Sequence, residues 1–213
     1  MLSHVEEFGK ALERAAPRYG VELGAQAVAQ LSLYYEHVMA WTGRLHLVAP
    51  CSPDEFATRH VLESLLALPH LPQGARVADV GSGAGLPIIP CLIVRPGIHA
   101  TLVESSARKA IFLREALRLL GLSHTATVVA GRFETTPVME VEIITCRALD
   151  RFKEMFPRLL AWSQPTSTLL LFGGPALELE IKKRALDYRA VLMPESEQRF
   201  LFVTRAAPLL SNP

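Results

Sequence analysis

The stretch from Arg76 to Pro87, which reads RVADVGSGAGLP, constrains the fold more than any other part of the chain. A short apolar run contains Asp79 and is followed by three glycines at alternate positions, after which Leu86 and Pro87 lead into another apolar segment. Alternating glycines allow positive φ angles and remove Cβ atoms where a ligand approaches the backbone. Proline is tolerated in a first helical turn. The stretch therefore predicts a buried strand, a tight loop that cradles a small molecule, and the start of a helix.

Strands and helices alternate from this point onward. Strands are expected at 76–80, 99–104, 125–130, 141–146 and 167–172, with helices at 87–95, 106–120, 151–162 and 175–186. The strands are almost continuously apolar, which is typical of a parallel sheet covered by helices on both faces. The last two strands, 189–193 and 199–205, are joined by a link too short for a parallel crossover and must be antiparallel neighbours. We expect an α/β fold with a seven-stranded, mostly parallel sheet ending in an antiparallel hairpin.

The first third of the chain shows helical patterns and no expected strand. Apolar residues recur at helical spacing in 5–15 and 28–39, residues 42–51 look irregular, and Ser52-Pro53-Asp54-Glu55 predicts a helix start with a capping box. We therefore expect an N-terminal helical extension at 1–72, a ligand-binding domain at 73–207 and a frayed tail at 208–213.

Composition limits the classes of protein that fit. Of the 213 residues, 50% are hydrophobic and 20% are charged, and the net charge is +1, so nucleic-acid binding would depend on local basic patches. The three cysteines are far apart, which disfavours a disulfide framework or a zinc site and favours a reducing compartment. The chain shows no signal-peptide pattern and no apolar run of transmembrane length. We expect a cytoplasmic protein with no metal and no membrane partner.

The order of residues in the glycine loop indicates its ligand. A dinucleotide fingerprint requires a glycine where this chain has Leu86, which disfavours an oxidoreductase. Asp79 suits a cationic ligand better than an anion, and Glu104, at the end of the next strand, can accept hydrogen bonds from both ribose hydroxyls. These features favour S-adenosylmethionine, although a tight turn without a ligand is the other possibility for any single glycine. The cofactor contacts predicted from this loop are Asp79, Gly81, Ser82, Gly83 and Gly85.

Two further strand ends carry candidate residues. Phe133 follows the third strand, where it is expected either to contact the adenine or to pack on its own helix. Arg147 ends the fourth strand at the mouth of the crevice in which open α/β sheets bind ligands. It is expected to contact a phosphate or the substrate, or to form a surface ion pair.

Several stretches match one known family in collinear order between about residues 40 and 150. They are Trp41 with Leu47, Arg59-His60-x-x-Glu63-Ser64, DVGSGAGLP at 79–87, Ile93-Val94-Arg95-Pro96, Glu104-Ser105, Lys109 with Phe112-Leu113-Arg114, Arg132 with Glu134, and Arg147-Ala148. In these stretches the chain resembles the bacterial 16S ribosomal RNA guanine-N7 methyltransferases, also called the glucose-inhibited division protein B family.

The resemblance implies a Rossmann-like class I methyltransferase that uses S-adenosylmethionine and acts on 16S ribosomal RNA. It implies the small ribosomal subunit or its RNA as the partner, and we expect a monomer. The cofactor contacts that it implies are Gly81, Leu86, Glu104, Phe133, Glu134 and Arg147. Ser105, next to Glu104, is also predicted to contact the cofactor.

The chain also departs from the family pattern. His46-Leu47-Val48 stands where the family has Asn-Leu-Thr, Ala84 replaces a proline, Glu63 replaces an aspartate, and Phe172-Gly173-Gly174 lacks the lysine of a Lys-Gly strand end. The missing lysine supports the alternative of a non-catalytic RNA- or ribosome-binding protein that keeps the fold.

The expected reaction needs little from the side chains. Guanine N7 has a free lone pair and no proton, so no general base is required and we name no catalytic residue; the main task is alignment. The predicted substrate contacts are His60, Arg132, Arg147 and Arg151. His60 is expected to stack on or hydrogen-bond a base or a phosphate, or to be an ordinary helix histidine.

Overall fold

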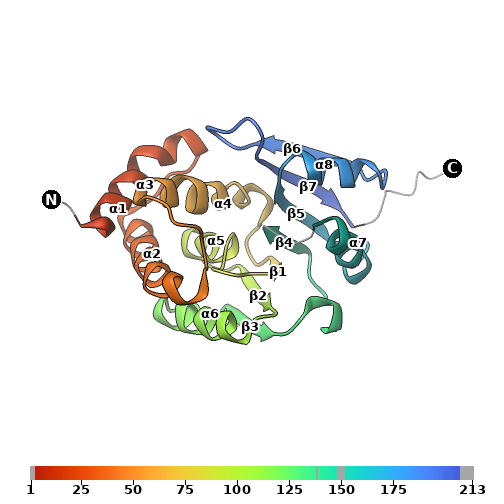
Figure 1. Cartoon of the computed structure of the whole chain (residues 1–213), viewed down its shortest axis with the longest axis horizontal. Helices are drawn as coiled ribbons and strands as arrows, with labels where there is room; N and C mark the ends of the chain where they lie inside the picture. Colours follow the sequence, from red (N-terminus) through yellow and green to blue (C-terminus); the bar gives the residue numbers. More distant parts are fainter. Residues whose placement is uncertain (1–2, 138, 148–151, 207–213) are drawn as a thin grey trace.

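One sheet of seven strands forms the centre of the molecule (Figure 1). The computed structural model describes residues 3–137, 139–147 and 152–206. The strands are β1 (Arg76–Val80), β2 (His99–Glu104), β3 (Ala126–Ala130), β4 (Ile143–Arg147), β5 (Thr168–Gly173), β6 (Tyr188–Leu192) and β7 (Phe200–Arg205). Their order is β3-β2-β1-β4-β5-β7-β6, with β1 to β5 parallel and β7 antiparallel to both of its neighbours. The predicted fold class is confirmed.

Each face of the sheet belongs to a different hydrophobic cluster. Successive side chains of a strand point to opposite faces. On β5, Leu170 belongs to one cluster, while its neighbours Leu169 and Leu171 belong to the other. All three are fully buried, so the continuous apolar pattern of the strand reflects helices on both sides.

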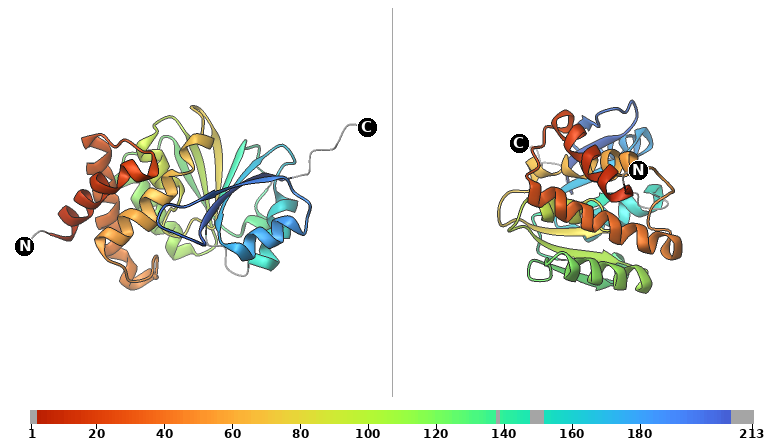
Figure 2. Two further views of the ribbon diagram at one scale, coloured as in Figure 1. Left: turned by 90° about the horizontal axis from the view of Figure 1, so that it is seen from above. Right: turned by 90° about the vertical axis from the view of Figure 1, so that its left-hand side faces the viewer.

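Helices cover the two faces unequally (Figures 1 and 2). The first face packs against α5 (Ile88–Val94), α6 (Ala107–Leu119) and the N-terminal helices. The second face packs against α7 (Phe152–Trp162) and α8 (Pro175–Lys182). In the described part of the chain, no helix is both long and apolar enough to cross a membrane.

The N-terminal extension contains more regular structure than the sequence predicted. Its elements are α1 (His4–Ala15), η1 (Ala16–Tyr19), α2 (Ala25–Leu45), α3 (Pro53–Glu55), η2 (Phe56–Leu62), α4 (Glu63–Leu65) and η3 (Leu68–His70). The helix α2 continues to Leu45, through part of the segment expected to be irregular. Ser52 caps the next helix as predicted, but the Glu55 carboxylate pairs with Arg59. That helix is π-helical over Phe56–Leu62, which the sequence did not predict.

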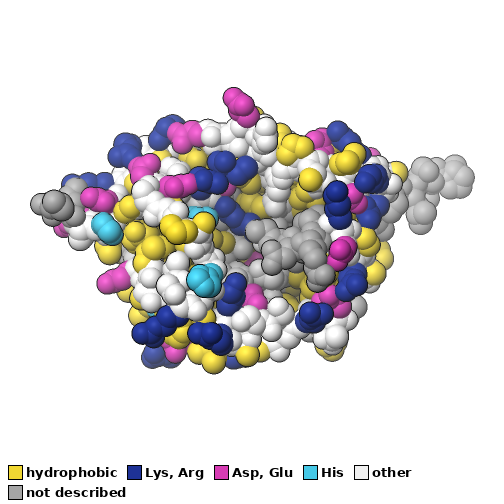
Figure 3. All heavy atoms as spheres, in the orientation of Figure 1, with side chains coloured by type: hydrophobic (Ala, Val, Ile, Leu, Met, Phe, Trp, Pro, Cys, Tyr) yellow, Lys and Arg dark blue, Asp and Glu magenta, His cyan; other side chains and the backbone are white. Residues whose placement is uncertain are grey.

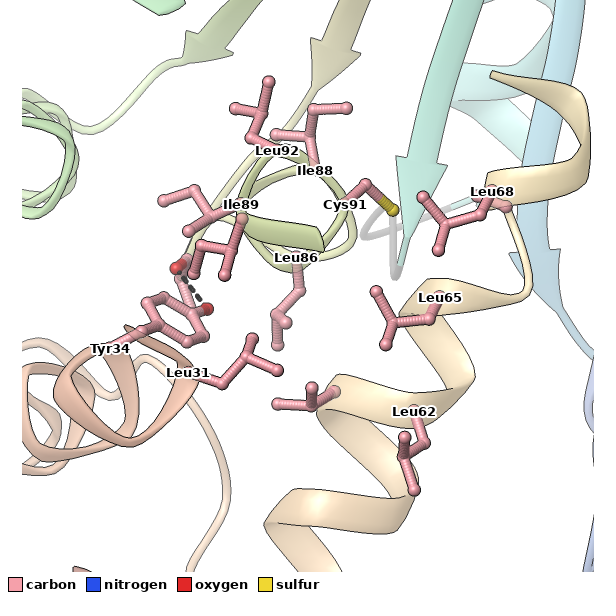
Figure 4. Close-up of a cluster of buried hydrophobic side chains, with 14 of the residues drawn as sticks. Leu31, Tyr34, Leu62, Leu65, Leu68, Leu86, Ile88, Ile89, Cys91 and Leu92 are labelled. Carbon is pink, nitrogen blue, oxygen red and sulfur yellow. Dashed lines mark hydrogen bonds between the residues drawn. The ribbon is translucent and has the colours of Figure 1, made fainter. Parts of the chain in front are cut away.

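The extension and the sheet domain share one hydrophobic cluster (Figure 4). Leu31 and Tyr34 of α2 and Leu65 of the following helix point toward Leu86 and α5, and Leu62 belongs to the same cluster. These side chains are at most 7% exposed. The division of the chain at residue 72 stays a prediction, but the cluster shows that the extension packs directly against the segment containing the glycine loop.

Candidate functional site

A cavity of about 720 Å³ lies at the carboxyl ends of the first four strands. Open α/β sheets bind their ligands at this edge, and the volume lies within the range of small-molecule sites. The wall on the sheet side comes from the glycine loop and from the segments that follow β2 and β3. The opposite wall comes from the extension, through His46, Leu47, Val48 and His60. The cavity therefore joins two parts of the chain that the sequence alone could not place relative to each other.

The glycine loop adopts backbone angles that favour glycine. Gly81, Gly83 and Gly85 have φ values of 70°, 54° and 89°. A Cβ atom on Gly83 would come no closer than 3.8 Å to its nearest protein atom, whereas one on Gly85 would lie 2.3 Å from Ile89 Cδ1. Gly83 therefore leaves free space beside the cavity, and Gly85 allows the loop to pack against α5.

Glu104 connects the glycine loop to the start of α6. Its Oε2 atom accepts a hydrogen bond from the Gly83 N–H at 2.9 Å, and its Oε1 atom accepts one from the Ser106 N–H at 2.7 Å. The side chain is buried but lines the cavity. Each carboxylate oxygen has a second lone pair, so Glu104 can accept ribose hydroxyls while it holds the loop in place.

Asp79 lies beneath the loop rather than in the cavity wall. Its Oδ1 atom accepts a hydrogen bond from Thr145 Oγ1 at 2.6 Å, and its Oδ2 atom has no partner among the described residues. Complete burial raises the pKa of Asp79 to about 7, although the hydrogen bond from Thr145 opposes this shift. The Ser82 hydroxyl donates instead to the main-chain carbonyl oxygen of Asp79 at 2.9 Å. Neither Asp79 nor Gly85 is among the residues that line the cavity.

The segment after β3 forms another part of the sheet-side wall. Phe133 lines the cavity and is 5% exposed, and its ring packs edge-on against Trp162 with 5.8 Å between the ring centroids. Phe133 thus packs on α7 rather than on its own helix, as one expectation had it, and its ring still lines the cavity. The adenine contact stays a prediction. Beside it, the Glu134 carboxylate lies 3.5 Å from the Arg158 guanidinium.

Arg147 reaches from the end of β4 to the helix of the extension. Its guanidinium donates hydrogen bonds to the Arg59 carbonyl oxygen, to Ser64 Oγ at 3.3 Å and to the Glu63 carboxylate at 3.3 Å. It also lies over the Phe172 ring, 5.7 Å from its centroid. Arg147 lines the cavity, but these contacts use both of its terminal nitrogens to hold the extension against the sheet.

Glu63 joins this contact to the terminal hairpin. It is 1% exposed, and its second carboxylate oxygen accepts hydrogen bonds from Arg199 at 2.8 and 2.9 Å. A buried carboxylate needs such partners because an unpaired buried charge is strongly destabilising. The carboxylate that replaces the family's aspartate thus binds two arginines from distant parts of the chain.

His60 lies on the π-helical segment and faces the cavity. Burial lowers its pKa to about 4, and the positive charges of Arg147 and Arg59 act in the same direction. Its ring packs on Phe56 at a centroid distance of 5.1 Å. His60 is therefore an uncharged group at neutral pH.

Most of the predicted site residues meet at this cavity. The predicted residues that line it are His60, Gly81, Ser82, Gly83, Leu86, Glu104, Ser105, Arg132, Phe133, Glu134 and Arg147. Arg151 lies outside the described residues.

Other lining residues were not predicted as site residues. They are His46, Leu47, Val48, Ala84, Val103, Ser106, Lys109, Gly131, Met155 and Arg158. Ser106 could have been found from the sequence, because it caps α6 directly after the carboxyl end of β2. Met155 and Arg158 carry no such signal, since only the packing of α7 brings them to the cavity.

A comparison with protein families decides which kind of protein has this cavity. The model of the GidB family, described as rRNA small subunit methyltransferase G, matches residues 27–204. The chain belongs to this family. Membership confirms the predicted family, the methyltransferase activity and S-adenosylmethionine as the cofactor.

Individual relatives of this methyltransferase support its assignment to the family. Ribosomal RNA small subunit methyltransferase G of Nitrosomonas europaea is 32% identical over 205 residues, which cover 92% of this chain and 94% of that protein. The protein of the same name from Sorangium cellulosum is 36% identical over 169 residues, which cover 76% of this chain and 70% of that protein.

Solved structures support the fold. An RNA methyltransferase from Salinibacter ruber in complex with S-adenosyl-L-homocysteine has a TM-score of 0.55 at 16% identity, covering 78% of this chain and 98% of that one. A mutant of MtNAS in complex with S-adenosylmethionine has a TM-score of 0.55 at 15% identity, covering 96% of this chain and 75% of that one.

Proposed function

We propose that this methyltransferase binds S-adenosylmethionine in the cavity and transfers its methyl group to N7 of a guanine in 16S ribosomal RNA. The observation that carries the proposal is that the Glu104 carboxylate, in the wall of the cavity, accepts hydrogen bonds from the Gly83 and Ser106 amides. The opposite wall would then contact the base that accepts the methyl group. The names of the relatives, which specify the RNA of the small ribosomal subunit, support this acceptor.

The sheet-side wall supplies the groups that would hold the cofactor. Glu104 would accept the ribose hydroxyls, Phe133 would contact the adenine, and Gly83 would leave room for close approach to the backbone. Asp79 and Gly85 would act from behind the loop, by fixing its shape. The other proposed cofactor contacts in this wall are Gly81, Ser82, Leu86, Ser105 and Glu134.

When bound, S-adenosylmethionine supplies an electrophilic methyl group on a positively charged sulfur. The residues of this chain need only align the acceptor nitrogen with that methyl group, because N7 carries no proton to remove. As the methyl is transferred, positive charge develops on the guanine ring. A further positive charge beside the base would oppose this step, and the neutral His60 ring adds none.

Basic side chains at the cavity would bind the RNA backbone. Lys109, Arg132 and Arg158 line it. Figure 3 shows lysine and arginine side chains around the centre of the face that it draws. Each neutralised phosphate releases counterions, so binding would weaken steeply as salt rises. The small ribosomal subunit or its RNA is the proposed partner, with the protein acting as a monomer in the cytoplasm.

The experiment is to incubate the protein and tritiated S-adenosylmethionine with 30S subunits that lack this modification. We expect label at N7 of one guanine of the 16S RNA. Binding of the cofactor without any label in guanine N7 would overturn the proposal and favour the non-catalytic RNA-binding alternative.

A further inference from the structure

The helix that carries His60 is irregular at the cavity. It is π-helical over Phe56–Leu62, with α-helical turns before and after. A π-helical turn widens the helix and shifts the direction of its side chains, and such turns are frequent at functional sites. His60 lies within this turn and reaches the wall opposite the glycine loop.

Hydrogen bonds from neighbouring side chains fix the turn on both sides of His60. Arg147 donates to the Arg59 carbonyl oxygen and to Ser64 Oγ, and Ser64 Oγ donates to the His60 carbonyl oxygen. Two carbonyl groups of the turn, those of Arg59 and His60, thus accept a hydrogen bond from a side chain. The Phe56 ring packs against the imidazole. Arg147 is therefore a positioning residue for His60.

The surroundings of the imidazole also determine where its proton lies. Nδ1 is buried and has no hydrogen-bond partner within the described part of the chain. A charged imidazolium would need acceptors for two N–H groups, and the charged groups that act on His60 are the cations Arg59 and Arg147. With the proton on Nδ1, a donor would be buried without an acceptor. The proton of the neutral ring therefore belongs on Nε2, which leaves an N–H donor for the cavity.

We propose that His60 donates a hydrogen bond from Nε2 to O6 of the target guanine and so selects guanine over adenine. This inference rests on the proposed function, in which N7 of that guanine receives the methyl group. O6 and N7 are the two acceptors on the same edge of guanine, whereas adenine presents an amino donor in place of O6. The His60 N–H therefore stabilises a bound guanine. With adenine, the same N–H would face the amino group of the base, which is also a donor.

The test compares His60→Phe, which keeps a planar ring without a donor, with His60→Gln, which keeps a donor. The substrate is 30S subunits lacking the modification, and both kcat/KM for the subunits and the affinity for S-adenosylmethionine are measured. We expect His60→Phe to lower kcat/KM by about 10- to 100-fold, because O6 loses its partner in a desolvated site. His60→Gln should stay within about threefold of the native protein, and both variants should bind the cofactor normally. The control is His99→Gln, an exposed position at the amino end of β2.

Each other outcome overturns the inference in a recognisable way. A native value of kcat/KM in His60→Phe would show that residue 60 only stacks on the base or does not contact it. Equal losses in both variants, with lowered thermal unfolding midpoints, would show that His60 only packs the helix. A native rate that falls as pH rises from 5 to 8 would show that a charged imidazolium contacts a phosphate. If the native protein itself labels no guanine, the proposed function fails instead.

Discussion

The two walls of the cavity are built from different kinds of contact. On the sheet side, backbone amides of the glycine loop and of Ser106 converge on one carboxylate, Glu104. On the extension side, a π-helical turn is held by an ionic cluster in which the buried Glu63 carboxylate binds Arg147 and Arg199. The first wall depends on local spacing along the chain, and the second depends on packing between distant segments. We infer that the first binds the cofactor and the second orients the RNA base.

The strongest test of this division substitutes the glycine that faces free space. Gly83→Val would force a branched side chain onto a residue with a φ of 54° and place its Cβ 3.8 Å from the nearest protein atom. We expect at least about a hundredfold loss of affinity for S-adenosylmethionine by calorimetry, because the side chain fills ligand space. Gly121→Val is the control, since it has a φ of 69° and open space away from the cavity. Equal losses in both variants would mean that backbone strain, not ligand space, causes the effect.

A second test concerns the acid beneath the sheet-side wall. Burial raises the pKa of Asp79 from 3.8 to about 7. Between these two pH values the folded protein keeps a proton on Asp79, whereas the unfolded chain has lost it. The native free energy of unfolding should therefore fall as pH rises through this window, by about 2 kcal/mol between roughly pH 5 and pH 7 from this group. Asp79→Asn removes this dependence. Chemical denaturation of both proteins at several pH values gives the difference, and parallel profiles would contradict a buried, titrating carboxyl group.

A third test concerns the bridge within the sheet-side wall. Glu104→Gln leaves one acceptor for two backbone donors and turns an amide N–H₂ toward the other. We expect about a tenfold loss of affinity for S-adenosylmethionine. The control is Glu142→Gln, which weakens a similar contact to the Arg76 backbone and side chain at the opposite end of β1. Unchanged cofactor affinity in Glu104→Gln would remove Glu104 from the binding site.

The smallest expected effect comes from a hydrogen bond between the extension and the glycine loop. Tyr34 of α2 is fully buried and donates a hydrogen bond to the Ala84 carbonyl oxygen of the glycine loop at 2.8 Å (Figure 4). Tyr34→Phe should cost about 1 kcal/mol of unfolding free energy and reduce cofactor affinity two- to threefold, or about 0.5 kcal/mol. Tyr188→Phe removes a hydrogen bond to Glu178 elsewhere and should leave cofactor affinity unchanged. If both variants bind the cofactor alike, α2 does not support the loop.

The sequence predicted the sheet-side wall better than the extension-side wall. The bounds of β1 and β2 were correct to the residue because short apolar runs lie between turn-forming residues. The short link before β7 predicted the antiparallel hairpin because chain length alone excludes a crossover. Glu104 and the glycines follow directly from their positions at strand ends.

The other wall depends on interactions that no local pattern records. Glu63 binds Arg147 and Arg199, which are 84 and 136 residues further along the chain. The π-helical turn changes the hydrogen bonds of a helix while the apolar spacing stays helical over so short a segment. Asp79 was expected to contact the ligand, but strand pairing with β4 places Thr145 beside it and buries it beneath the loop.

The most direct test of the two-wall account measures two quantities on two variants. Cofactor affinity and kcat/KM for unmodified 30S subunits are determined for Glu104→Gln and His60→Phe, with cofactor at saturation in the turnover assay. We predict that Glu104→Gln weakens cofactor binding, while His60→Phe keeps native cofactor affinity and loses turnover on the RNA. A loss of cofactor affinity in His60→Phe as large as that in Glu104→Gln would contradict the account, because it would show that both walls bind the cofactor.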